Sequence, residues 1–207
     1  MTATSRIPTC WIIDHNPDAT ESLRQLLETG GYGQVLGTSA SVADWSGQPV
    51  DCLFIRITAW DDYLHWRWTH RGSAAETVVF LSGRFEKGSR HLREDLDFHL
   101  RPPYQPGRIA GIMRRRIDPD FHRRSLDLFF LNIRYRFQVV YLRDLWYIEG
   151  NGGGTIHVHT ARGKYTVSGT LGTFQRRIPI PWQRASRSVV AAQYEPVRLT
   201  SCSRSKG

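Results

Sequence analysis

Apolar runs and stretches of helical periodicity alternate along the first half of the chain. Strands are predicted where apolar residues follow one another, at residues 9–13, 34–37, 52–55 and 78–81. The last two runs are apolar throughout, as is typical of strands buried on both faces. Helices are predicted at residues 19–29, where leucines recur at helical spacing, and at residues 108–117. This alternation predicts an α/β fold with a doubly wound parallel sheet over residues 1–117.

After residue 128 the hydrophobic period becomes that of strands. Extended segments rich in aromatic and β-branched residues are predicted at residues 129–133, 137–141, 145–149, 155–160 and 165–167. In the fourth segment, Ile156 and Val158 lie on one face, and His157 and His159 on the other. Residues 118–127 combine a proline, acids and paired arginines without an apolar period, which predicts a linker. Residues 128–207 are therefore expected to form a second, mostly β domain.

Positive charge is concentrated in the second half. Residues 1–117 carry 14 Lys and Arg against 13 Asp and Glu, a net of +1, whereas residues 118–207 carry 14 against 6, a net of +8. An anionic partner therefore belongs to the second half, although charge alone leaves nucleic acid, an anionic membrane and no ligand open. No apolar run is long enough to span a bilayer, and residues 1–6 lack the apolar region of a signal peptide. Because the three cysteines are scattered and odd in number, no disulfide framework is expected, and the protein is predicted to be cytoplasmic.

Four polar residues follow predicted strands, namely Asp14, Arg56, Ser82 and Arg101. In parallel sheets such residues meet at the carboxyl ends of the strands. Their order is similar to that of the receiver domain of bacterial response regulators. In that family, paired acids after the first strand hold Mg²⁺, and an Asp after the third strand accepts a phosphoryl group. A Ser or Thr and a Lys after the next two strands then contact that group. The resemblance implies that Asp14, Ser82 and Arg101 hold matching positions, with His15 in place of the second acid.

Arg56 occupies the place of the phosphoryl acceptor. A guanidinium stays protonated and cannot act as the nucleophile that an aspartyl phosphate requires. It would also bring positive charge to where Mg²⁺ should bind, and no metal or cofactor is expected. Arg56 is predicted either to pair with Asp14, holding the crevice in one state, or to be an exposed strand-end residue. The first domain is therefore interpreted as a pseudo-receiver.

The second half resembles the LytTR DNA-binding domain. The similarity is carried by the motifs DLWYIEGN at 144–151, GKY at 163–165, SGTL at 168–171 and WQRASRSVV at 182–190. It implies a mostly β domain, usually found behind a receiver, whose strand-end loops enter successive major grooves of duplex DNA. Such regulators often bind direct repeats as dimers. The closing hairpin of the family is missing after Val190, so the domain is expected to be incomplete at its C-terminal end.

The candidate DNA-binding residues are Asn151, Arg162, Lys164, Ser168, Thr170, Arg184 and Arg187. The basic side chains can neutralise phosphates, and arginine can also bind guanine. Asn151 can pair with adenine, or can simply form a turn among its neighbouring glycines. Ser168 or Thr170 is predicted to cap a short helix and to offer donors to a phosphate. The two neighbouring histidines lack a third ligand, so a metal site is not predicted.

Together these features predict a transcriptional regulator of the LytTR response-regulator type that binds duplex DNA without aspartyl phosphorylation. Its expected partners are DNA, a second copy of the chain, and a sensor or regulatory protein, with no membrane. The alternative is a pseudo-receiver that acts through protein contacts without binding DNA. An enzyme is not expected, because no nucleophile–base pair, metal-ligand spacing or cofactor loop is present.

Overall fold

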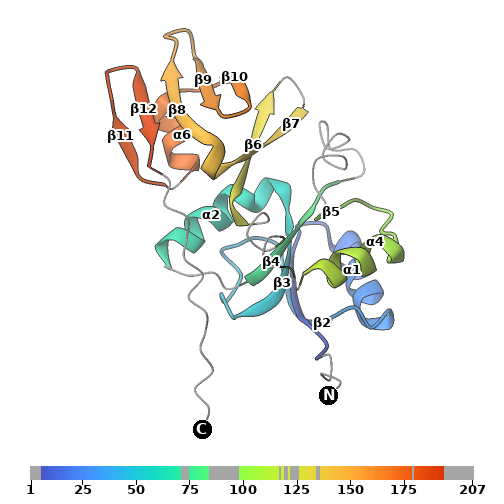
Figure 1. The fold of residues 1–207 in the computed structure, drawn as a ribbon. Helices are drawn as coiled ribbons and strands as arrows, with labels where there is room; N and C mark the ends of the chain where they lie inside the picture. The colour runs from blue at the N-terminus through green and yellow to red at the C-terminus, as the bar shows by residue number, and fades with distance from the viewer. Residues whose placement is uncertain are drawn as a thin grey trace.

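The computed structural model describes residues 6–70, 75–83, 98–116, 118, 121, 126–133, 136–178 and 180–193. The first half contains β1 (Thr9–Ile13), α1 (Pro17–Thr29), β2 (Gln34–Ser39), β3 (Val50–Arg56), η1 (Ile57–Ala59), α2 (Trp60–Thr69), β4 (Ala75–Leu81), β5 (His99–Leu100) and α4 (Pro106–Arg115). The second half contains β6 (Leu128–Ile133), β7 (Arg136–Tyr141), η2 (Leu142–Asp144), β8 (Leu145–Gly150), β9 (Thr155–Thr160), β10 (Gly163–Ser168), α6 (Leu171–Arg177), β11 (Trp182–Arg184) and β12 (Val189–Ala192). Figure 1 gives their arrangement.

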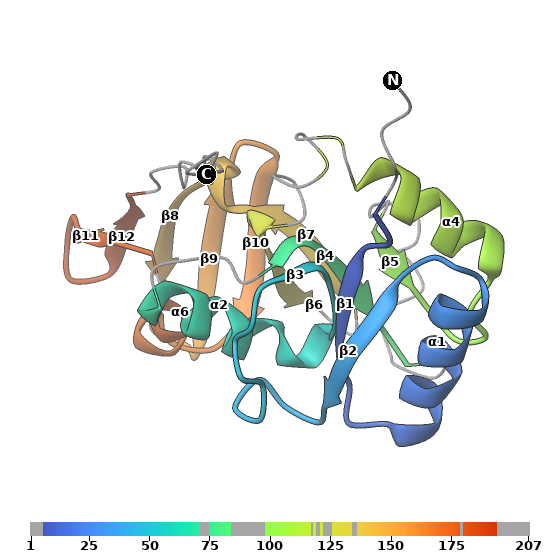
Figure 2. The same cartoon turned by 90° about the horizontal axis from the view of Figure 1, so that it is seen from below.

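The first half is built on a parallel sheet of five strands in the order β2-β1-β3-β4-β5. Helices α1 and α4 cover one face and α2 lies against the other (Figures 1 and 2). Strand β3 is buried from Cys52 to Ile55, as its unbroken apolar run predicted. Asn16 begins α1 by accepting a hydrogen bond from the backbone N–H of Ala19, which satisfies a donor at the helix start. The predicted doubly wound α/β fold is therefore present.

The second half is β-rich, as predicted. Five antiparallel strands follow the order β10-β9-β8-β12-β11, and β6 and β7 form a separate hairpin. On β9, Ile156 and Val158 are buried while the two histidines are only partly covered. Helix α6 begins at the cap residue Thr170 and packs Phe174 against Phe129, with ring centroids 5.9 Å apart. The alternation of β9 therefore sets the inner face of the sheet, and α6 covers it.

The two halves share one hydrophobic core. The indole Nε1 of Trp60 in α2 donates to the carbonyl of Leu128 at 2.8 Å. Phe80 of β4 meets Phe130 of β6 edge-on at 5.0 Å between centroids. A single cluster of buried side chains runs from β1 to β12 through these contacts. The halves therefore pack as one body.

Within the predicted linker, the structure describes two apolar residues that are buried in the core. Phe121 and Leu126 are 0% and 2% exposed, and Phe121 packs edge-on against Phe98. Two apolar residues are too few to set a period, so the polar residues around them dominate the sequence pattern. The sequence predicts that a closing hairpin is missing at the C-terminal end. This prediction concerns residues from 194 onward, which lie outside the described part of the chain. Across the described ranges, no helix has the length and apolar character needed to cross a membrane.

Candidate nucleic-acid interface and receiver-like crevice

Asp14 and Arg56 form an ion pair at the point where the strand order of the first sheet reverses. Asp14 follows β1 and Arg56 ends β3, and these neighbouring strands bring the side chains together. The Nη1 of Arg56 lies 3.2 Å from the Oδ2 of Asp14, whose side chain is fully buried. The backbone N–H of Asn16 donates to the other carboxylate oxygen at 3.0 Å. The predicted pairing is confirmed, and the carboxylate matching the family's metal ligand already has a cation beside it.

Tyr104 lies close enough to this pair for both charges to influence it. Burial, and then the Asp14 carboxylate, raise the pKa of the Tyr104 hydroxyl above its ordinary value, and the Arg56 guanidinium opposes them. The phenol oxygen is buried and has no hydrogen-bond partner among the described residues. The Tyr104 hydroxyl is therefore buried and neutral, near an ion pair whose two charges compensate each other.

Ser82 contacts a histidine, and Arg101 borders a separate hollow. The hydroxyl of Ser82 is 2.8 Å from the Nε2 of His99, and both residues are buried. Arg101 borders a hollow of about 280 Å³ that is also lined by Arg108, whereas Asp14 borders a different hollow of about 880 Å³ between α1 and β2. Arg101 and Asp14 therefore line two different hollows. Sequence reasoning missed His99, although a histidine inside a buried strand signals a buried polar partner.

Two loops of the second sheet lie together at its end farthest from the first half (Figure 1). They are residues 151–154, between β8 and β9, and residues 185–188, between β11 and β12. We call them the distal loops. Because β12 pairs with β8, the N–H of Gly150 donates to the carbonyl of Ser188 at 2.7 Å and joins the loops. Asn151, Arg184 and Arg187 are exposed there.

The glycine loop keeps Asn151 at the surface. The left-handed backbone conformations fall on Gly152 and Gly154, with φ of 76° and 71°. The amide nitrogen of Asn151 is 3.5 Å from His157, a contact at the limit of a hydrogen bond. The neighbouring strand end joins the same loop, because the N–H of Gly169 donates to the carbonyl of Gly154 at 2.8 Å. Ser168 and Thr170, on either side of Gly169, therefore lie near the distal loops.

The remaining candidates differ in how free their side chains are. The Thr170 hydroxyl accepts from the N–H of Thr173 at 3.2 Å, so it caps α6. Arg184 donates through Nη2 to the carbonyl of Arg187 at 3.3 Å and thereby supports its own loop. For the Arg187 guanidinium, the described residues provide no hydrogen-bond partner. Among the three candidates of this paragraph, Arg187 is therefore the most available to an anion.

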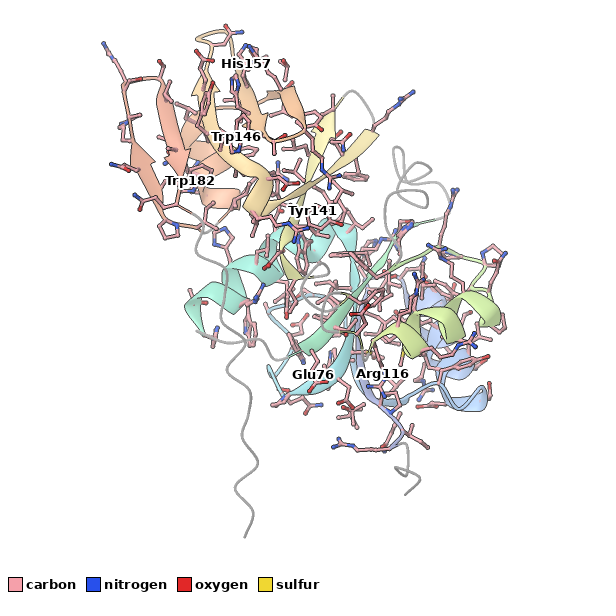
Figure 3. All side chains as sticks on the ribbon, viewed as in Figure 1. Glu76, Arg116, Tyr141, Trp146, His157 and Trp182 are labelled. Atoms are coloured by element: carbon pink, nitrogen blue, oxygen red, sulfur yellow. The ribbon has the colours of Figure 1, made fainter. Side chains whose placement is uncertain are left out.

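Arg162 and Lys164 lie at the opposite end of the sheet. Arg162 occupies the turn between β9 and β10, and Lys164 follows it on β10. Six-residue strands separate this proximal end from the distal loops, a distance of about 17 Å. The structure therefore divides the predicted DNA-binding residues between two ends of one sheet. Figure 3 marks the two ends with His157, toward the distal loops, and Tyr141, beside the proximal turn.

The outer face between these ends carries aromatic and imidazole rings. Tyr147 and His159 stack at 4.2 Å with an interplanar angle of 15°, and His159 lies 3.4 Å from Glu149. Trp146 is 57% exposed at a bulge of β8. A bulge re-aims a side chain, which explains the exposed indole within an apolar run. The alternation of β9 predicted that His159 lies on the outer face of the sheet, but it did not predict the stacking on Tyr147.

Among known proteins, the resemblances to this chain are to solved structures, at low sequence identity. No family model matches the sequence, and no curated protein matches it. The parallel strand order is that of flavodoxin and receiver proteins. The first half is receiver-like in fold. Several solved structures that share about half of the chain are receiver domains of response regulators, at low sequence identity.

Three similar structures illustrate this. A Burkholderia pseudomallei protein described as related to pilus assembly shares 15% identity over 56% of this chain and 92% of its own, with a TM-score of 0.41. The receiver domain of the PhyR response regulator from Erythrobacter litoralis shares 17% over 54% and 90%, at 0.38. The response regulatory domain of mrkE from Klebsiella pneumoniae shares 15% over 53% and 94%, also at 0.38. The strand order β2-β1-β3-β4-β5 therefore gives the first half its fold class.

Proposed function

We propose that the protein is a DNA-binding transcriptional regulator of the LytTR response-regulator type that acts without aspartyl phosphorylation. The observation that carries this proposal is the convergence of the distal loops. The bond from Gly150 to Ser188 places Asn151 beside Arg184 and Arg187, all exposed, at one end of the sheet. These loops belong to the half of the chain whose net charge is +8, from 14 basic and 6 acidic residues.

The chemistry of the distal loops suits a duplex. Arg187 offers an exposed planar fork, which can bind a phosphate or the O6 and N7 of guanine. Asn151 offers an amide that can pair with adenine in the major groove. Paired strands flank both loops, so the backbone of each loop is positioned before DNA binds. Electrostatic attraction would supply affinity, and the few base contacts would supply sequence preference.

The first half would act in this regulator without a phosphorylation switch. Arg56 occupies the acceptor position and neutralises Asp14, so neither the nucleophile nor an open metal site is provided. This half would then work through protein contacts, either with a second copy of the chain or with a regulatory protein. Incubation with Mg²⁺ and acetyl phosphate should leave the mass of the protein unchanged, and a phosphorylated product would contradict this part of the proposal.

The decisive experiment selects binding sites from a pool of random duplexes with the purified full-length protein. Affinity for the recovered site should fall steeply with salt, because cations are released from the DNA on binding. Arg187→Ala should weaken binding, whereas Arg114→Ala removes the same charge from an exposed position on α4 and should leave binding unchanged. No duplex binding at low salt would refute the proposal and favour the pseudo-receiver interaction protein.

A further inference from the structure

Two arginines share one aromatic ring at the proximal end of the second sheet. The guanidinium carbons of Arg143 and Arg162 lie over the ring of Tyr141, 5.1 Å and 5.3 Å from its centroid. Both side chains also approach Asp144 through their Nε atoms, at 3.9 Å for Arg143 and 3.2 Å for Arg162. The ring and the carboxylate thus orient the two guanidiniums together, and we call them the proximal arginine pair.

The backbone beneath this pair is also held in place. The N–H of Ala161 donates to the carbonyl of Asp144 at 2.8 Å, which ties the turn of Arg162 to η2. The N–H of Arg162 donates to the hydroxyl of the buried Thr160 at 3.1 Å. Arg143 belongs to the same short helix, which is anchored through its buried neighbour Leu142. The position of each arginine is therefore set before any ligand binds.

The ends of both guanidiniums remain available. The side chains of Arg143 and Arg162 are 44% and 61% exposed. Since the contacts with Asp144 are made by Nε, the terminal nitrogens have no hydrogen-bond partner among the residues that the structure describes. Two cations against one carboxylate leave a net positive charge, to which the exposed Lys164 adds. Exposed ion pairs contribute little to stability, so a stabilising role does not account for this arrangement.

We propose that the proximal arginine pair is a second site for backbone phosphates of duplex DNA, separate from the distal loops. This inference rests on the proposed function. The free terminal N–H groups of a planar guanidinium match the oxygens of a phosphate. Stacking on the ring of Tyr141 already restricts the arginine side chains, which reduces the conformational entropy that they lose on binding. The two ends of the sheet are about 17 Å apart along the strands, and residues 185–188 also lie two to three strands to the side of the β9–β10 turn, so both sites fall within one helical repeat of DNA, roughly 34 Å. One duplex lying along the outer face would therefore present phosphates to both ends.

The salt dependence of binding tests this site. The full-length protein is titrated with its selected duplex at 50 and 200 mM salt, using fluorescence anisotropy. Each phosphate contact contributes about 0.9 to the logarithmic salt slope, so a fourfold rise in salt weakens binding about 3.5-fold per contact. The unchanged protein should therefore lose about 12-fold more affinity over this range than the variant Arg143→Ala/Arg162→Ala.

A matched control removes the same charge elsewhere. The variant Arg24→Ala/Arg114→Ala loses two exposed arginines of the first half and should keep the full salt slope. Tyr141→Leu keeps both charges but removes the ring, so it should weaken binding without reducing the slope, and Tyr141→Phe should restore the affinity. Equal slopes for the proximal double variant and the unchanged protein would overturn the second site.

Footprinting locates the contact on the DNA. Hydroxyl-radical cleavage should reveal two protected windows on the duplex within one helical turn of each other. The proximal double variant should lose one window and keep the other. The assignment would be overturned if the double variant lost both windows or neither window. It would also be overturned if a duplex too short to reach the proximal arginine pair bound the unchanged protein tightly and with the full salt slope. If the unchanged protein binds no duplex, the proposed function fails and this site fails with it. Binding of acidic polypeptides at Arg143 and Arg162 in place of DNA would overturn the choice of partner.

Discussion

Replacing Arg56 with methionine should destabilise the protein strongly, because it leaves the Asp14 carboxylate buried without its cation. The Asp14 side chain is 0% exposed and that of Arg56 is 11% exposed. After the substitution, the carboxylate would keep the hydrogen bond from the N–H of Asn16 at 3.0 Å. It would also keep a distant contact with the exposed His15, at 3.8 Å. These cannot replace a guanidinium within the core.

The expected loss can be estimated from the geometry. Two unit charges separated by the observed 3.2 Å attract each other by about 5 kcal/mol at an effective dielectric constant near 20. Desolvation already offsets much of this attraction in the folded protein. Removing one partner nevertheless leaves the other charge buried, and such losses are about 3–5 kcal/mol. This is a large share of the roughly 5–15 kcal/mol that stabilises an ordinary domain.

The assay is urea denaturation at neutral pH, followed by tryptophan fluorescence. Arg56→Lys keeps a cation and should lose less stability than Arg56→Met. Asp14→Asn/Arg56→Met removes both charges and should recover most of the loss, because no charge is left unpaired. The reasoning would be refuted if Arg56→Met lost less than about 1 kcal/mol, or if the double variant lost the sum of its two single variants.

Three further predictions concern Tyr104 and the junction between the halves. The pKa of Tyr104 is raised in the folded protein, so its contribution to stability is intact below the unfolded value near 10 and is lost as the pH rises above it. Tyr104→Phe should therefore flatten the alkaline fall in unfolding free energy measured between pH 9 and 11, and an unchanged pH profile would contradict this. Trp60→Phe should cost about 1–3 kcal/mol, because the buried carbonyl of Leu128 loses its donor. The unchanged chain should unfold in a single transition by both fluorescence and circular dichroism, and two separate transitions would contradict the shared core.

Much of the first half could be predicted because its buried strands are unbroken runs of apolar residues. An unbroken apolar run such as 52–55 is compatible with burial on both faces, and the order of such runs suggests a parallel sheet. The pairing of Asp14 with Arg56 followed from the same logic, since residues that end neighbouring parallel strands must meet. The contact between Ser82 and His99 did not follow, because it depends on how the two-residue strand β5 sits beside β4.

The proximal arginine pair was harder to predict because Arg143 and Arg162 come from separate turns. Arg162 could be nominated for its charge, but Arg143 could not, since only the fold brings Arg162 to the ring of Tyr141, two residues before Arg143. The exposed Trp146 was hidden for a similar reason, because a bulge is a property of the strand pair rather than of one strand. An apolar pattern predicts that a side chain is buried but not which residue it packs against, so the contact of Phe80 with Phe130 could not be predicted.

The bond between Trp60 and Leu128 has a consequence for synthesis of the chain on the ribosome. These residues are 68 positions apart, and at about 5–20 residues per second the second follows the first by about 3–14 s. During that interval the aromatic side chains of α2 and β4 lack the strand that covers them. The nascent first half would therefore expose a hydrophobic surface to chaperones or to neighbouring nascent chains. A pause in translation before residue 128 would prolong that exposure.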